Sequence, residues 1–288
     1  MNVELRKVSD LTRPRQYGLA LVELMIAMVL GLIVVGAAFA VFLSNQQSYA
    51  ANEGLNRVQE GARVALELMS RDVRAAGGSA CSSASELAGG GADVVAFRDN
   101  PVRGSSSRLI VTSAEDSAYR ISSATSASVT LEAGQVDKAS EAFSKDDVLL
   151  LCNARKSFLV TATAVDDTKI THSALPGGYD PQNDPYATIA TVAVARFRNV
   201  EWFTGANGRG GSSLYVRRQG GANEEVVEGV DALTVQFRDA TTGNYLAAPG
   251  SNPIDAVHLS LTLSGPAIDG TPLSRNAASV VNVRARTL

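Results

Sequence analysis

The longest apolar stretch of the chain runs from Leu24 to Leu43 and contains 20 residues without a charge. As an α-helix these residues would span about 30 Å, which is the thickness of the hydrocarbon core of a bilayer. No Lys or Arg follows until Arg57, so the stretch has no cation of its own. The pattern therefore predicts a helix that can cross a membrane.

Beyond this stretch the helical pattern continues on one face only. Apolar residues recur at steps of three and four, as in the buried stripe of a helix, and charged residues occupy the other faces. Arg63 and Glu67 stand four apart, a spacing that allows an exposed ion pair. We expect one helix from Leu19 to Ala76, ended by Gly77-Gly78, with its second half packed on a globular head. The apolar stripe comprises Leu55, Val58, Ala62, Ala65, Met69 and Val73.

After Gly78 the pattern changes to period two, which is typical of half-buried antiparallel strands. It is clearest in Leu233–Phe237 and Val257–Leu263, where apolar and polar residues alternate. Further strands are expected at Asp93–Phe97, Arg108–Thr112, Ser128–Leu131, Asp147–Cys152, Phe158–Val165, Val192–Phe203, Leu214–Arg217 and Ser279–Arg284. Surface loops are expected at the glycine and serine clusters Ala88–Ala92, Gly104–Ser107 and Gly205–Ser213. One long helix followed by a β-rich head indicates an α+β fold.

Glu23 is the residue that a simple membrane anchor does not explain. An ionised carboxylate costs roughly 2.5–3.5 kcal/mol at mid-bilayer depth, so it needs a shallow position or a cationic partner. The neatest partner is a free α-amino group, created by a cut just after Gly18 and presented by a neighbouring copy of the chain. At neutral pH such an amine is at least half protonated.

The residues before that position have the charge of a cytoplasmic leader. Met1–Gly18 has a net charge of +2, from Arg6, Lys7, Arg13 and Arg15 against Glu4 and Asp10. Two other interpretations stay open. A secretory signal is favoured by Ala38-Phe39-Ala40, which resembles a small-x-small cleavage site, although the apolar run is longer than usual. An uncut anchor explains the hydrophobicity but not Gly18 together with Glu23.

At these residues the chain resembles the type IV prepilins, whose signature is Gly, then an apolar or aromatic residue, then a short stretch ending in Leu-Val-Glu-Leu. The matching residues are Gly18, Leu21, Val22, Glu23 and Leu24, and Leu19 stands where Phe is most common. The resemblance implies cleavage between Gly18 and Leu19 by a prepilin peptidase, N-methylation of Leu19 and an assembly contact at Glu23. It also implies a pilin-like fold, with the long helix packed on an antiparallel β-rich head.

Three parts are therefore expected along the chain. A cleaved basic leader occupies residues 1–18. The helix follows at 19–76, with 19–43 in the membrane or filament core and 44–76 on the head, and the exported head covers 77–288. The formal net charge of the chain is −3. Without its basic leader the chain is more acidic still, so nothing indicates a general nucleic-acid surface.

The chain has two cysteines, Cys81 just after the predicted helix and Cys152 at the end of an apolar strand. If the head is exported, an even cysteine count in an oxidising compartment indicates one disulfide. Closing a loop of about 70 residues would stabilise the fold by roughly 4 kcal/mol in the chain-entropy description. Two unrelated buried thiols are the alternative.

The C-terminal portion resembles one branch of the same family, the PilW-like minor pilins. The shared features are Arg71–Gly77 leading to Cys81, Asp147–Cys152 followed by Phe158, and the strands at Leu214–Arg217, Glu225–Val230 and Leu233–Phe237. The resemblance implies a minor pilin of a type IV pilus that helps to initiate assembly and sits at or near the tip. The alternative is a J-type minor pseudopilin of a type II secretion system.

The resemblance also implies where the protein acts and with what. Before assembly the chain would be a single-pass protein of the bacterial inner membrane with its head in the periplasm, and afterwards part of the pilus at the cell surface. The implied partners are other minor pilins and the major pilin through their N-terminal helices, the prepilin peptidase, the inner-membrane assembly platform and a large tip adhesin.

Little in the sequence indicates catalysis or a cofactor. The two histidines, His172 and His258, have no Cys or acidic cluster nearby at metal-ligand spacing, and His258 falls on the polar side of its strand, where it should face solvent. No Gly-x-Ser-x-Gly elbow is present. Asp180, Asn183 and Asp184 offer oxygen atoms to calcium but lack the spacing of a calcium loop. We therefore expect no enzyme activity, no cofactor and no resident metal.

Overall fold

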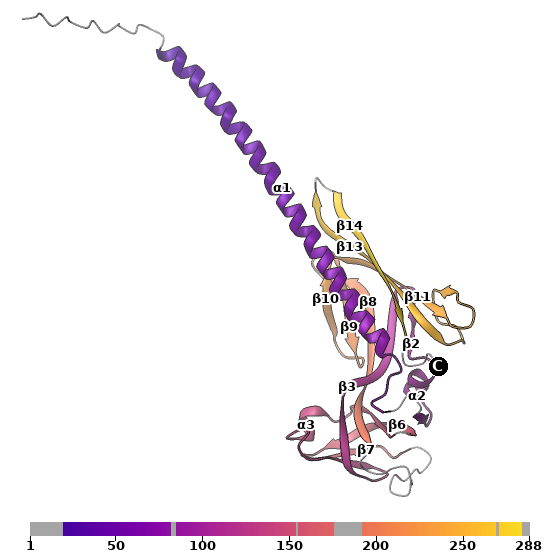
Figure 1. Cartoon of the computed structure of the whole chain (residues 1–288). Helices are drawn as coiled ribbons and strands as arrows, with labels where there is room; N and C mark the ends of the chain where they lie inside the picture. Colours follow the sequence, from indigo (N-terminus) through magenta and orange to yellow (C-terminus); the bar gives the residue numbers. More distant parts are fainter. Residues whose placement is uncertain (1–19, 82–84, 154, 176–191, 269–270, 284–288) are drawn as a thin grey trace, which may run out of the picture. The chain divides into compact units, whose positions relative to one another are not determined.

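The computed structural model describes residues 20–81, 85–153, 155–175, 192–268 and 271–283. The chain divides into two compact units, residues 1–53 and residues 54–288. Helix α1 (Ala20–Ala75) extends through the boundary between them. It is drawn in indigo in Figure 1, and the strands of the second unit run from magenta to yellow. A long N-terminal helix followed by an antiparallel β-rich head is the pilin-like α+β fold that the sequence predicts.

Helix α1 ends within one residue of the predicted position. Gly77 has a φ of 68°, the left-handed conformation that glycine adopts without steric cost. Its N–H donates to the carbonyl of Thr112 at 2.9 Å, and the N–H of Gly78 donates to the carbonyl of Ala75 at 2.9 Å. The end of the helix is therefore joined by a backbone hydrogen bond to the sheet. Leu19, the expected first residue, lies outside the described residues.

The larger of two sheets has the order β10-β9-β8-β5-β6-β7-β4-β3-β2 within the part of the chain that the structure describes. Strand β3 also pairs with β8, and β1 pairs in parallel with β6. The strands are β1 (Glu86–Ala88), β2 (Val102–Ser105), β3 (Arg108–Ala124), β4 (Ser128–Leu131), β5 (Val148–Cys152), β6 (Lys156–Val165), β7 (Lys169–His172), β8 (Ala193–Ala206), β9 (Ser212–Arg218) and β10 (Asn223–Glu228).

The smaller sheet is formed by the last part of the chain and has the order β12-β11-β13-β14. Strands β13 and β14 form a long antiparallel hairpin, drawn in yellow in Figure 1. The bounds are β11 (Val230–Asp239), β12 (Tyr245–Leu246), β13 (Ile254–Ile268) and β14 (Thr271–Asn282).

The second half of α1 packs into a core that it shares with both sheets. Five of the six predicted stripe residues are buried there, together with Trp202 of β8 and Phe237 of β11, and Leu55 is half-buried. The amphipathic prediction is thus confirmed. The salt bridge of Arg63 is formed with Glu60 (Nε–Oε2 3.2 Å) rather than with the expected Glu67. Because both side chains are exposed, this pair contributes little to stability.

Two further apolar clusters fill the rest of the head. One lies among β3 to β8 and α3 (Ala139–Ala142), and the other surrounds α2 (Ala92–Arg98) and Cys152. Helix α2 corrects the strand predicted at Asp93–Phe97. Its run is too short for periodicity to distinguish a strand from a helix. Asp93, in the first turn, interacts favourably with the helix dipole. Val94, Ala96 and Phe97 are buried and form the side of the helix that faces the core.

Loop predictions were correct where glycine connects strands and wrong where glycine lies inside one. The connection expected at Gly205–Ser213 is confined to residues 207–211, because β8 and β9 extend into it. Gly104 and Ser105, expected in a loop, belong to β2. Gly104 has a φ of 140°, and a Cβ there would lie 2.0 Å from the carbonyl oxygen of Arg108, so only glycine fits this tight hairpin.

Candidate functional site

The first half of α1 presents apolar side chains on all sides. From Leu21 to Leu43 its large apolar residues are 53% to 72% exposed. Among the described residues, α1 is the one helix that is long and apolar enough, by length and composition, to cross a membrane. A helix that is apolar all round needs lipid or other helices around it, since water disfavours such a surface.

Glu23 lies in the first turn of α1 and is exposed. A carboxylate at this end of a helix is favoured by the helix dipole. No ion pair to it is found among the described residues. Gly18 and Leu19 lie outside the described residues, and the predicted cleavage and N-methylation therefore stay predictions.

The helix is attached to the head through a buried carboxylate that the sequence reading overlooked. Asp72 is 7% exposed and lies on the buried face of α1. Its Oδ2 accepts a hydrogen bond from Nε1 of Trp202 at 2.9 Å, and its Oδ1 accepts one from Nη2 of Arg198 at 3.1 Å. Both partners belong to β8, a central strand of the larger sheet. The sequence signal that could have indicated this attachment is a single Asp beside Met69 and Val73 on the apolar face of the predicted helix.

The electrostatic balance at Asp72 is set by burial. Desolvation raises the pKa of Asp72, and the indole of Trp202 and the guanidinium of Arg198 oppose the rise. Trp202 is 1% exposed, so its N–H has no access to water and depends on this acceptor. The trio of Asp72, Trp202 and Arg198 therefore fixes the helix on the sheet at one rotation and one height.

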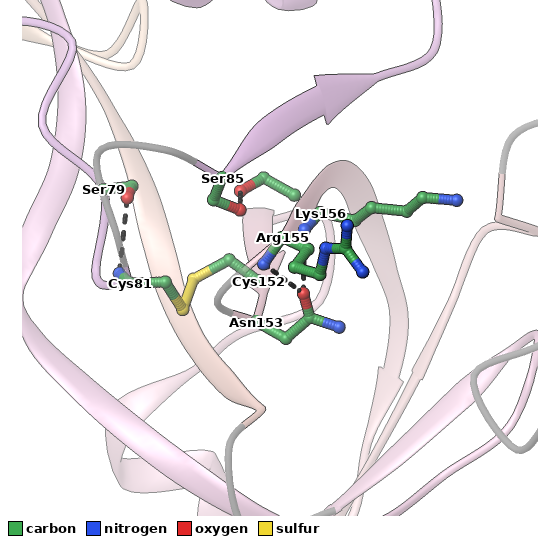
Figure 2. The surroundings of a disulfide bond; sticks show 8 residues. Ser79, Cys81, Ser85, Cys152, Asn153, Arg155 and Lys156 are labelled. Atoms are coloured by element: carbon green, nitrogen blue, oxygen red, sulfur yellow. Dashed lines mark hydrogen bonds between the residues drawn. A yellow bond between two sulfur atoms is a disulfide. The ribbon is translucent and has the colours of Figure 1, made fainter. Parts of the chain in front are cut away.

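The second attachment is the disulfide between Cys81 and Cys152, which is present as expected. Figure 2 shows it joining the segment after α1 to the end of β5. Oδ1 of Asn153 accepts hydrogen bonds from the N–H groups of Arg155 (2.8 Å) and Lys156 (2.7 Å), which holds the turn beside Cys152. The bond connects residues 71 positions apart and so restricts the unfolded chain.

Replacing both cysteines by serine should lower the free energy of unfolding by about 2–5 kcal/mol, because the unfolded chain regains loop entropy. Urea denaturation of the full-length protein in detergent, followed by the fluorescence of Trp202, would measure this. A reducing agent should move the wild-type midpoint to that of the variant and leave the variant unchanged. Equal midpoints for oxidised wild type and variant would show that the bond does not stabilise the head.

Within the described part of the chain, the two histidines do not form a site with each other or with acidic groups. His172 is buried in β7, where desolvation lowers its pKa, and its Nδ1 lies 2.7 Å from the carbonyl oxygen of Ser173. His258, expected to face solvent, is half-buried, because Gln236 (Nδ1–Oε1 3.0 Å) and the ring of Tyr245 cover it. The described residues contain no group of three or more metal-ligating side chains. The calcium candidates Asp180, Asn183 and Asp184 lie outside them.

Comparison with known proteins identifies the N-terminal segment. Residues 13–39 match the family described as the prokaryotic N-terminal methylation motif. Neither the search of curated proteins nor the search of solved structures found a match. The matched residues include Gly18, Leu19 and Glu23 and continue into the exposed apolar part of α1.

The motif, the long N-terminal helix and the antiparallel head together support a type IV pilin-like protein, of the pilin or pseudopilin type. An apolar N-terminal helix that carries this motif is consistent with a membrane-anchored pilin.

Proposed function

We propose that the chain is a minor pilin of a type IV pilus, similar to the PilW-like branch, and that it helps to initiate pilus assembly at or near the tip. The observation that carries the proposal is the methylation motif at residues 13–39, at the start of a helix whose apolar side chains are exposed on all sides. Such a helix is stable in lipid before assembly and against other pilin helices afterwards, since both environments exclude water.

The PilW-like assignment is supported by the structural roles of the residues that carry the resemblance. The stretch from Arg71 to Gly77 contains Asp72, which binds β8, and the helix-ending glycine. Cys81 and Cys152 are bonded to each other. Several of the residues that join the helix to the head are thus among those shared with that branch. A subunit whose head is held in the filament by its helix requires such a joint.

In this proposal the protein is a structural subunit and not an enzyme. Its partners are other minor pilins, the major pilin, the prepilin peptidase, the assembly platform of the inner membrane and a large tip adhesin. It stands in the inner membrane with its head in the periplasm before assembly and in the pilus afterwards.

A J-type minor pseudopilin of a type II secretion system is the second candidate, because the methylation motif supports pilins and pseudopilins equally. Gene neighbours distinguish the two. Adjacent minor-pilin genes favour the pilus, and adjacent secretion-system genes favour the pseudopilin. Recovery of the chain in sheared surface filaments would independently favour the pilus.

The proposed function predicts that the mature chain begins at Leu19. A prepilin peptidase should remove the basic leader Met1–Gly18 and free the α-amino group that Glu23 requires. Intact-mass measurement and N-terminal sequencing of the protein from membranes would detect the cut, and a mass increase of one methyl group would detect the modification.

Two results would contradict this prediction in different ways. A mature chain that begins at Val41 would support the secretory signal at Ala38-Phe39-Ala40. A chain that retains Met1 would support an uncut anchor. A Gly18→Ala variant tested in parallel should keep its leader if the prepilin peptidase makes the cut.

A further inference from the structure

The edge strands of the head differ in how well they are protected against pairing with another strand. Strand β10 carries Glu224, Glu225 and Glu228, and β2 and β12 have only four and two residues. Charges and short length both prevent unwanted strand addition. Strand β14 has 12 residues, and no described strand pairs with its outer edge. From Asn276 to Asn282 it contains neither a charge nor a proline.

The outer face of the small sheet is almost uncharged. Residues that pair across β11, β13 and β14 form rows on this face. One row consists of Gln236, His258 and Val280, and the next row consists of Thr234, Ser260 and Ala278. On this face Arg238 is the charged side chain of the paired rows, and Asp255 neutralises it (Nη1–Oδ2 2.5 Å). Arg275 of β14 pairs with the buried Leu263 and therefore belongs to the opposite face. Depletion of charge is the property that distinguishes the centre of a protein interface from other surfaces.

The same face carries an exposed apolar patch. Outside α1, the large apolar residues that the described head exposes are Val95, Tyr245 and Val280. Tyr245, 42% exposed, contacts the ring of His258 at 6.2 Å between centroids, and Val280, 56% exposed, pairs with His258 from the other side. Two of the three therefore flank one half-buried histidine next to the open edge of β14.

Arg275 indicates the charge of the partner. It is exposed near the start of β14, and no ion pair to it is found among the described residues. A second copy of this chain could not supply the acid by pairing β14 with β14, because Thr271–Asn282 contains no Asp or Glu in any register. A parallel pair in register would also bring Arg275 next to its own copy.

We propose that β14 accepts an extended strand from a different polypeptide, with a carboxylate opposite Arg275 and uncharged side chains over Tyr245, His258 and Val280. The added strand would satisfy the backbone N–H and carbonyl groups along the open edge, and the patch would supply buried apolar area. This contact belongs to the head and is distinct from the packing of α1. It does not require that the partner be a pilin.

Site-specific photocrosslinking of the full-length protein in the cells that produce it tests the proposal. p-Benzoylphenylalanine at Val280 should give one adduct with a different polypeptide, and mass spectrometry should place the link in an extended segment that contains Asp or Glu. The matched control is the same probe at Val95, an exposed apolar residue of α2, which should give no such adduct. Adducts of the chain with itself, or equal adducts from both positions, would overturn the proposal.

Substitutions at the edge then distinguish strand addition from contact through side chains alone. Ala278→Lys, at an exposed position, should abolish the adduct because a lysine on an edge opposes strand pairing. Arg275→Glu should reduce it roughly fivefold, equivalent to about 1 kcal/mol, and Arg275→Lys should retain it. An adduct that persists at wild-type yield in Ala278→Lys would show that the edge is not used.

Amide hydrogen exchange gives an independent readout of the backbone. In the natively purified complex the amides of Asn276–Asn282 should exchange more slowly than in the same protein after dissociation, while those of β10 should not change. Unchanged exchange in β14 would overturn the proposal. Sheared filaments from the same cells distinguish the proposed pilin function from the proposed strand addition. If the protein enters filaments but gives no Val280 adduct, only the strand addition is contradicted.

Discussion

Cells that produce the Glu23→Ala variant should release at least about tenfold less of this protein with sheared pili than cells that produce the wild type. The helix that carries Glu23 is apolar on all sides, so in lipid or among other helices an opposite charge beside the carboxylate is screened very little. We expect that charge to be the N-terminal α-amino group of an adjacent pilin subunit. Removing one partner of a buried pair costs about 3–5 kcal/mol, which corresponds to more than tenfold in an equilibrium.

The controls for this prediction separate assembly from folding. Cleavage, membrane insertion and the Cys81–Cys152 bond should be normal in Glu23→Ala, because none of them involves this carboxylate. Glu67→Ala removes an exposed carboxylate from the same helix, within the part that packs on the head, and should leave recovery unchanged. If Glu23→Ala is recovered in filaments at the wild-type level and pili are as numerous as before, the carboxylate is not an assembly contact.

The largest effect on stability is expected at Asp72. Asp72→Ala should lower the free energy of unfolding by about 3–5 kcal/mol, since it leaves the buried N–H of Trp202 without an acceptor and the guanidinium of Arg198 without its anion. Trp202 is the single tryptophan of the chain, so its fluorescence during urea denaturation of the full-length protein reports unfolding directly. Asp116→Ala removes an exposed partner of Arg71 on the same helix and should cost less than about 1 kcal/mol.

The raised pKa of Asp72 gives this prediction a pH dependence whose sign follows from burial. The folded protein binds the proton of Asp72 more readily than the unfolded chain does, because burial disfavours the ionised form. This contribution to stability is therefore complete below the unfolded pKa of about 3.9 and is lost as the pH rises through the higher folded pKa. Asp72→Asn cannot ionise and keeps an acceptor for the indole.

The free energy of unfolding of the wild type minus that of Asp72→Asn should accordingly decrease between pH 3 and pH 7. Measuring both proteins at the two pH values cancels the titration of groups that they share. A difference that increases with pH would mean that Arg198 outweighs burial and that the folded pKa is lowered. A destabilisation by Asp72→Ala of under about 1 kcal/mol would show that the trio does not hold the helix.

Periodicity predicted the repetitive parts of the fold and failed where tertiary contacts decide. The stripe from Val58 to Val73 is buried as expected, and β4 has the predicted bounds Ser128–Leu131. Residues 93–97 are apolar enough for a strand, but they form a helix that packs in the apolar cluster around α2 and Cys152. The short strands β2 and β7 were missed, because four residues that pair at an edge or a turn leave no alternation to detect.

The sequence by itself determined the N-terminal half of the candidate site. The features that define it are local: a glycine, a carboxylate five residues later and a run of 20 uncharged residues. The membrane-spanning helix and the peptidase cleavage that they predict depend only on residues close together in the chain. The tertiary structure decided how the head is attached and what it exposes. Asp72 and Trp202 are 130 positions apart, and Tyr245, His258 and Val280 meet only through the register of three strands. Such contacts depend on how the chain folds back on itself, because hydrogen-bond register and burial have no local signal in the sequence.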